Sequence, residues 1–328
     1  MNLYGASVLL VVFGALLVAL DLLLLALTPL VLPRLGRLAP STRTDAILFV
    51  RSLPLLLAAA VTSLAFLPAW WRHEPENTGE TVSLLLLAMA ITSILPILQG
   101  VQRAARMFLR TRARILVWRG LGRSAPRSHS PYEVVEVRSD DLALCVGGYL
   151  RPTIYASADV MKSLDPAELD AALAHEVSHA SQRDPLRLLW MGSCPDFLQW
   201  FGLDAPWRRA FARACEFAAD ARASDGRPEV ALDLASALVK VARLQSLSPE
   251  SASGLVEVAV SPAFSSRIDL QARIEALANP PTPDAGANAV SGAPFLVADA
   301  LIVVAGMGGV ASEPVHELTE TVGRLLSP

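Results

Sequence analysis

The sequence predicts a membrane α-helical bundle of about four spans, joined to an α+β domain. The 328 residues are 53% hydrophobic and 18% charged, with a mean hydropathy of +0.43. An ordinary soluble domain is less apolar and carries about 25% charged residues. Long apolar runs fill the first hundred residues, and short alternating strands and amphipathic helices begin at about residue 131. The composition therefore favours a multi-pass membrane protein with one globular part.

Four segments are predicted to span the membrane, since about 20 apolar residues cross a bilayer. The first, 5–31, is interrupted only by Asp21, either a functional intramembrane acid or a residue facing the bundle interior. The second and third, 46–71 and 81–101, precede a weaker fourth, 293–311, which is rich in glycine and alanine. The predicted organisation is three transmembrane helices in 1–102, a basic juxtamembrane segment in 103–130, a globular domain in 131–278, a linker in 279–292, the fourth span in 293–311 and a short tail in 312–328.

Arginine counts in the connections set the predicted orientation. The first loop carries Arg34, Arg37 and Arg43, and eight arginines without an acid follow Val101, ending at Arg127. Because cytoplasmic loops are basic, the N-terminus is expected outside and the segment after the third span inside. Such an arginine run could bind nucleic acid, but its place directly inside a span favours anionic membrane lipid, and no nucleic-acid partner is expected.

The globular part begins with a small predicted sheet. Segments 132–137, 142–146 and 152–157 alternate like strands, and Gly147-Gly148 supplies a turn between the last two. The edge of such a sheet can bind an extended peptide as one more strand, held mainly by backbone hydrogen bonds.

A helix is predicted to follow the sheet. Asp165 can cap its first turn, Pro166 suits the first helical position, and Glu168 completes a capping box. Asp184-Pro185 ends it, because a residue before proline avoids helical dihedrals.

Two histidines on this helix form a metal-binding pattern. His175 and His179 lie one turn apart on one face, so both imidazoles can reach one metal, with Glu176 beside them. This spacing is typical of zinc hydrolases. Ordinary helix histidines are the alternative, but only five histidines exist in the chain and two fall at this spacing. A zinc site is therefore expected here.

A second helix, 206–224, carries a polar stripe formed by Arg209, Arg213, Glu216 and Asp220. Glu216 is the natural third zinc ligand, because catalytic zinc keeps three protein ligands and a position for water. Asp220, one turn on, can accept the other ring N–H of a liganding histidine. Without the histidine motif, a solvated charged face would be the favoured interpretation.

Together these motifs resemble the BlaR/MecR-type membrane zinc metallopeptidases, gluzincins related to the CAAX-prenyl-endopeptidase and HtpX peptidases. The resemblance covers the three N-terminal spans and residues from about 130 to 280. It implies a zincin-like (gluzincin) metallopeptidase domain that faces the cytoplasm from the bacterial inner membrane, with Zn²⁺ as cofactor. The matching motifs are Gly147-Gly148-Tyr149-Leu150-Arg151-Pro152, His175-Glu176-x-x-His179, Arg183-Asp184-Pro185-Leu186 and Glu216-x-x-Ala219-Asp220.

The resemblance also implies roles for single residues. His175, His179 and Glu216 would bind zinc, and Glu176 would be the general base. Asp184 is a further motif position, placed with Asp220 around the ligands, although spacing alone gives it no role.

A segment further along departs from the related families. Residues 261–268 are similar to a His-Pro-x4-Arg-Ile signature, with serine in place of histidine. Arg267 or Arg273 could stabilise the oxyanion, but a solvated or structural arginine is the favoured interpretation.

The expected function is hydrolysis of peptide bonds in a cytoplasmic or membrane protein, in antirepressor-like signalling or quality control. By analogy alone, the substrate would be a transcriptional repressor. The receptors of this family carry a penicillin-binding sensor after the fourth span, whereas only residues 312–328 follow it here, so beta-lactam sensing is not expected.

Two alternatives remain. The chain could be a non-catalytic membrane scaffold or signalling subunit with a structural zinc, but such a site does not need Glu176. Intramembrane proteolysis is disfavoured, because the acids and the arginine around the histidine helix are too polar for lipid exposure.

Overall fold

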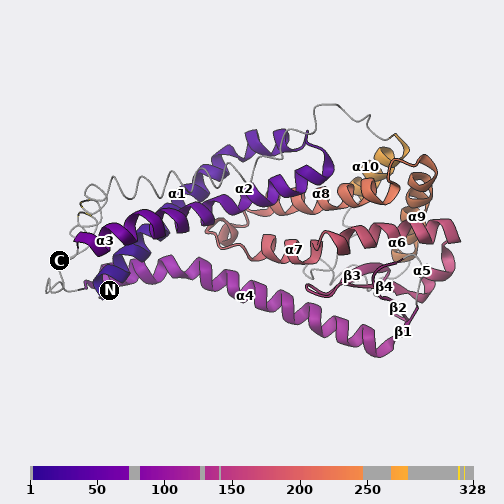
Figure 1. Ribbon diagram of the computed structural model, residues 1–328, viewed down its shortest axis with the longest axis horizontal. Helices are drawn as coiled ribbons and strands as arrows, with labels where there is room; N and C mark the ends of the chain where they lie inside the picture. Colours follow the sequence, from indigo (N-terminus) through magenta and orange to yellow (C-terminus); the bar gives the residue numbers. More distant parts are fainter. Residues whose placement is uncertain are drawn as a thin grey trace.

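Three long helices run side by side from the end of the molecule that carries the N-terminus (Figure 1). The computed structural model describes residues 3–73, 82–125, 130–139, 142–246 and 267–279, together with Glu317 and Thr321. The elements of this part of the chain are α1 (Leu3–Leu35), α2 (Pro40–Val61), the π-helical turn η1 (Thr62–Phe66), α3 (Leu67–His73), α4 (Leu84–Leu121), β1 (Gly122–Ser124), β2 (Val134–Val137), β3 (Leu144–Gly147), β4 (Thr153–Ser157), α5 (Ala158–Ser163), α6 (Pro166–Ser181), α7 (Asp184–Ser193), the 3-10 turn η2 (Leu198–Phe201), α8 (Ala205–Ser224), α9 (Pro228–Ser246) and α10 (Arg267–Ala278).

Three helices of the described chain are long and apolar enough to cross a membrane: α1, the joined helix Pro40–Arg72 and α4. They indicate membrane association and correspond to the first three predicted spans. The predicted fourth span at 293–311 lies outside the described residues, as do positions 280–292 of the predicted linker.

The helix α4 is much longer than the predicted third span. Its 38 residues include 103–121, which were expected to form a separate basic segment. Arginine, leucine and alanine are good helix formers and dominate this stretch, so nothing ends the helix where its apolar half ends. Near the far end, Arg119 donates hydrogen bonds to the Tyr155 hydroxyl (3.2 Å) and to Thr153 Oγ1 (3.3 Å). Part of the arginine run therefore docks α4 onto the sheet.

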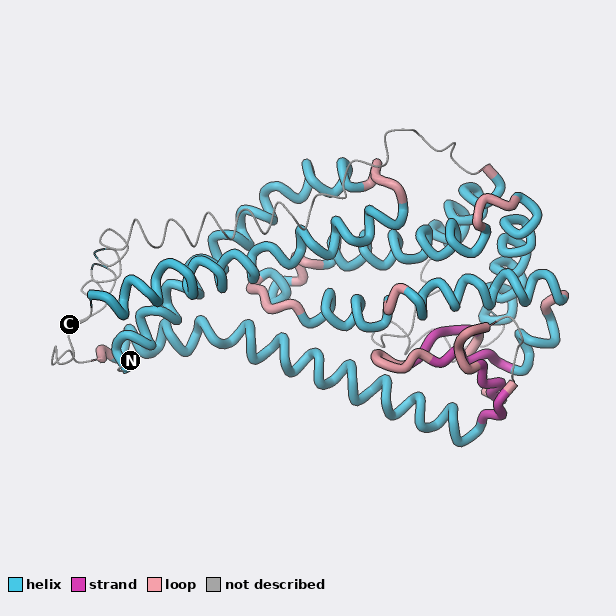
Figure 2. Tube along the Cα trace, in the orientation of Figure 1, coloured by secondary structure: helices cyan, strands magenta, loops and turns pink. Residues whose placement is uncertain are grey.

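The sheet has the strand order β1-β2-β4-β3 and gathers at one end of a mainly helical molecule (Figure 2). β2 pairs with β4 in parallel, whereas β1 and β3 each pair antiparallel with their neighbours. β2, β3 and β4 confirm the three predicted strands, and Gly148 takes a positive φ of 99° at the predicted turn. β1 was not predicted, because three residues are too short for a recognisable alternation.

Helices cover the sheet on both faces. Residues of α6 and α9, including Leu173 and Val241, share one buried cluster with Val134 and Ile154 of the sheet. In a second cluster, Trp118 of α4 packs against Tyr155, with ring centroids 5.3 Å apart. The sheet is thus fixed between the long helix and the helix that carries the histidine motif.

The connector between α7 and α8 joins the globular part to the three long helices. Asp21 of α1 is buried and accepts a hydrogen bond from the Phe197 N–H at 3.1 Å. Arg51 of α2 forms a buried ion pair with Asp196. Asp21 therefore faces protein, which is the second of the two expectations for this residue.

Candidate metal centre

The helix α6 begins where its sequence predicts. The Glu168 carboxylate accepts a hydrogen bond from the Asp165 N–H at 2.9 Å, as in a capping box, and Pro166 occupies the first turn. From α9, Ser236 Oγ and Lys240 Nζ each contact the Glu168 carboxylate at 2.6 Å. The start of the histidine helix is therefore anchored by local and by long-range contacts.

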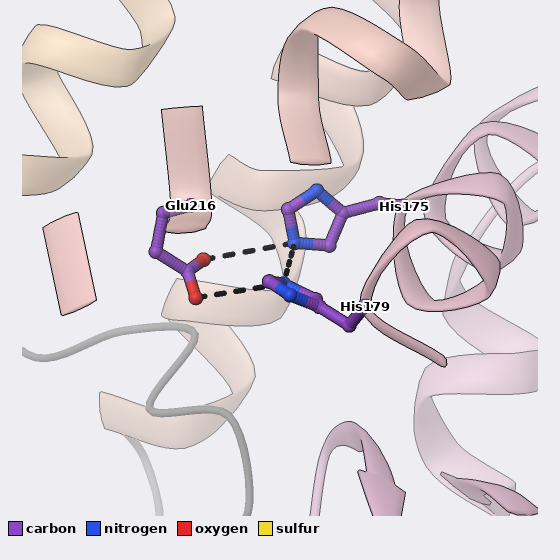
Figure 3. A group of neighbouring side chains, drawn as sticks. All are labelled: His175, His179 and Glu216. Carbon is purple, nitrogen blue, oxygen red and sulfur yellow. Dashed lines mark hydrogen bonds and ion pairs between the residues drawn. The ribbon is translucent and has the colours of Figure 1, made fainter. Parts of the chain in front are cut away.

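The two histidines of α6 point toward one carboxylate of α8 (Figure 3). The Nε2 atoms of His175 and His179 lie 3.1 Å apart. Glu216 places Oε2 at 3.6 Å from the first of these nitrogens and Oε1 at 3.6 Å from the second. All three side chains are buried. The structure therefore brings together the three residues that the sequence nominated as ligands, including one that lies 37 positions from the nearer histidine.

A separate carboxylate holds the other nitrogen of each imidazole. Asp220 Oδ1 lies 3.0 Å from His175 Nδ1, and Asp184 Oδ2 lies 2.8 Å from His179 Nδ1. Each of these carboxylates faces Nδ1, so Nε2 of each ring is the nitrogen that faces Glu216 and is placed to bind a cation. Asp220 occupies the position expected from its spacing. Asp184 gains a partner that spacing did not reveal, because the left-handed Arg183 (φ 54°) turns the chain back toward α6.

The donor set fits a metal ion. One donor atom from each of His175, His179 and Glu216 can be chosen so that all three lie within 4.8 Å of one another. Two imidazole nitrogens and a carboxylate at such distances need a proton or a metal cation between them. A set of two histidines and one glutamate suits catalytic zinc, which keeps a further position for water. Glu176 is 2% exposed, and its Oε2 has no hydrogen-bond partner among the described residues.

Burial is the largest single effect on the pKa of Glu216, Glu176 and His175. It would raise the pKa of Glu216, but Arg273 and the histidines hold the pKa of this carboxyl well below its usual range. It raises the pKa of Glu176, against the opposing effect of the histidines. It would lower the pKa of His175, yet hydrogen bonds with Asp220 and Glu216 raise that pKa to about 9. Glu216 is thus ionised at neutral pH, and a bound cation must displace a proton from His175.

Arg273 of α10 completes the charge balance of the site. Its Nη1 lies 2.8 Å from Glu216 Oε2, while Nη2 and Nε hold the two oxygens of Asp220, each at 2.7 Å. The side chain is 3% exposed. These contacts correspond to the structural arginine that the sequence favoured over an oxyanion role. Arg267 begins α10, but its side chain lies outside the described part of the chain.

A family model described as BlaR1 peptidase M56 matches residues 81–277, which is more than half of the 328 residues. The matched region contains α4, the sheet, the histidine helix α6, and α8 with Glu216. A search of the curated proteins finds no match.

Proposed function

Because the chain belongs to the BlaR1 peptidase M56 family, we propose that it is a membrane-anchored, zinc-dependent endopeptidase that cleaves a cytoplasmic or membrane protein. The observation that carries the proposal is that His175, His179 and Glu216 lie close enough together to share one metal ion. In addition, a carboxylate contacts the Nδ1 atom of each ring, Asp220 for His175 and Asp184 for His179. The small sheet beside α6 supports a zincin-like fold for this part of the chain.

The chemistry follows from the positions of the side chains. When bound, zinc lowers the pKa of a water molecule toward about 7 and polarises the scissile carbonyl. Glu176 accepts the proton of that water and passes it to the leaving amine nitrogen. Burial raises the pKa of Glu176, and a higher pKa favours uptake of a proton by this carboxylate. Asp184 and Asp220 keep the rings of His179 and His175 in the liganding orientation.

The biological role is proposed on analogy with the family. We place the peptidase part on the cytoplasmic side of a bacterial inner membrane, because the arginine-rich residues follow the third span directly. Anionic lipid is the proposed contact of the first arginines after Val101. A transcriptional repressor is the proposed substrate class in a regulatory role, and damaged membrane proteins are the class in a quality-control role.

Zinc content and casein cleavage of the detergent-purified protein test the proposal. The wild type should hold about one zinc and cleave, in line with one three-ligand site. Glu176→Gln should keep the metal and lose at least about 100-fold in cleavage rate, as expected for loss of a general base. Glu216→Ala should lose metal and activity together.

Glu229→Gln is the matched control, because this glutamate is exposed on the first turn of α9. It should retain both metal and activity. A wild-type protein that binds zinc and never cleaves would support the scaffold alternative, and cleavage unchanged by Glu176→Gln would identify a contaminating protease. Failure of the wild type to bind zinc would overturn the metal centre itself.

A further inference from the structure

The helix α7 leads from the metal centre toward the end of the molecule that carries the N-terminus (Figure 1). Its first residue, Asp184, holds His179 Nδ1 at 2.8 Å. One turn later, Arg187 donates from Nη1 to Asp184 Oδ1 at 3.1 Å and pairs through Nη2 with Asp45 of α2. A continuous chain of polar contacts therefore runs from a long apolar helix to one of the candidate ligands.

In this series of contacts, Asp184 and Arg187 are largely shielded from solvent, whereas Asp45 is accessible. The Arg187 side chain is 14% exposed and lies over the Phe211 ring, with its guanidinium carbon 5.6 Å from the ring centroid. Asp184 is 2% exposed, whereas Asp45 is 77% exposed. The guanidinium is thus held in one place by an aromatic face and two carboxylates, and it fixes the oxygen of Asp184 that does not contact His179.

Two further contacts tie α7 and its connector to the same helix. Trp190 donates a hydrogen bond from Nε1 to Ser52 Oγ at 2.8 Å, and Asp196 pairs with Arg51. Asp45 and Ser52 are seven residues apart, two turns along one face of α2. A shift or rotation of α2 would therefore displace Arg187 together with the rest of α7.

We propose that Arg187 is a positioning residue for the metal centre, and that through Asp45 it makes the zinc affinity of this centre depend on the position of the membrane helix α2. This inference rests on the proposed zinc site, but not on the identity of any substrate. The guanidinium holds Asp184 in the orientation that fixes the His179 ring. A displacement of α2 would therefore move Arg187 and change how Asp184 holds the His179 ring.

Zinc affinity of the detergent-purified protein, measured by competition with a chromophoric chelator, tests the inference. Arg187→Gln should weaken zinc binding by up to about 10-fold, the lower end of the cost of losing a direct partner of a ligand, because Arg187 contacts Asp184 and not His179 itself. Asp45→Asn should weaken it about 2- to 5-fold, because an exposed partner contributes less. In the Arg187→Gln background, Asp45→Asn should have no further effect, since the route is already broken.

Arg222→Gln is the matched control. This half-buried arginine of α8 lies in the field of Asp184 and Asp45, yet its Nε and Nη1 have no hydrogen-bond partner among the described residues. It should change zinc affinity by less than about 2-fold. An equal loss in both arginine variants would show that bulk charge, not positioning, is responsible, and would overturn the inference.

Three other results separate the outcomes. If Arg187→Gln fails to fold, Arg187→Lys and the surface variant Asp45→Asn decide, and unchanged zinc affinity in both would refute the inference. Additive effects in the double variant would also refute it. A wild type that binds zinc but never cleaves would end the proposed peptidase function and leave this affinity test intact.

Discussion

Replacing Arg273 tests the charge balance of the metal centre. Arg273→Met keeps an unbranched chain of similar length and removes a guanidinium that contacts both Glu216 and Asp220. All three side chains are less than 10% exposed, so water cannot take over the lost contacts. Removing one partner of a buried ion pair costs roughly 3–5 kcal/mol. For a domain of this size, each kcal/mol lowers the melting temperature by roughly 2–4 °C, so a fall of about 6–20 °C is expected.

The assay is thermal unfolding in detergent, followed by circular dichroism after removal of metal with a chelator. Added Zn²⁺ should recover part of the loss of melting temperature in Arg273→Met, because the metal cation then neutralises Glu216 in place of the guanidinium. The melting temperature of Arg273→Lys should lie between those of the wild type and Arg273→Met. A lysine keeps the positive charge but cannot form the several hydrogen bonds with which the guanidinium holds two carboxylates. Arg213→Met is the control, because the ion pair of Arg213 with Asp269 at 3.6 Å also joins α8 to α10, but its side chains are 50% and 35% exposed.

A metal-free Arg273→Met protein that melts within roughly 2 °C of the wild type would refute this reasoning. It would mean that the two carboxylates repel each other too little to need the guanidinium. A loss of the same size in Arg213→Met would equally refute it, because the effect would then not be specific to the site.

Three further predictions concern the surroundings of the site. Hydrogen bonds from Lys240, Ser236 and the Asp165 N–H hold the pKa of Glu168 below its usual range, against the effect of burial. The stabilisation by Glu168 is therefore present above about pH 4.5 and is lost as pH falls through its lower folded pKa, so Glu168→Gln should lower the melting temperature at pH 7 and converge with the wild type in acid. Trp118→Ala, at a fully buried contact of α4 with the sheet, should cost roughly 3–5 kcal/mol in denaturant unfolding, while the exposed Val117→Ala should change little. Replacing Arg106 and Arg110 together by glutamine should abolish any stabilisation of the protein by anionic over neutral lipid in nanodiscs, because each arginine near a charged surface contributes about 1 kcal/mol; an unchanged lipid preference would contradict the proposed lipid contact.

Local signals predicted the histidine helix well. The sequence Asp165-Pro166 with Glu168 defines a helix start by capping chemistry alone, and the spacing of His175 and His179 fixes which side chains share a face. Glu216 could be nominated because a zinc site of this type needs a third ligand. These inferences depend on one turn of helix at a time, so they survive without knowledge of the tertiary structure.

The remaining contacts of the site depend on packing between distant segments. Arg273 meets Asp220 across 53 positions, and Arg187 meets Asp45 across 142, so no spacing rule relates either pair. From the sequence, Asp184 was only a motif position without a role, and the left-handed Arg183 shows which way the chain returns toward α6. The continuation of α4 to Leu121 was not predicted, because a change from apolar to charged residues marks the end of a membrane segment and does not show whether the helix goes on.

The unbroken α4 also sets the distance between its own apolar half and the sheet. From Val101, the end of its apolar half, to Leu121, where the sheet begins, the helix extends about 30 Å along its axis. The other edge of the sheet meets the helix earlier, about 15 Å from Val101, where the Thr111 hydroxyl lies 2.9 Å from that of Tyr149 just after β3. In the proposed peptidase, a membrane-anchored substrate that paired with the sheet would have to span about 15 to 30 Å with its own chain, and an extended chain covers about 3.3 Å per residue. Bonds within roughly five to nine residues of its membrane segment would then be out of reach, so the length of the juxtamembrane linker, and not only its sequence, would select the site of cleavage.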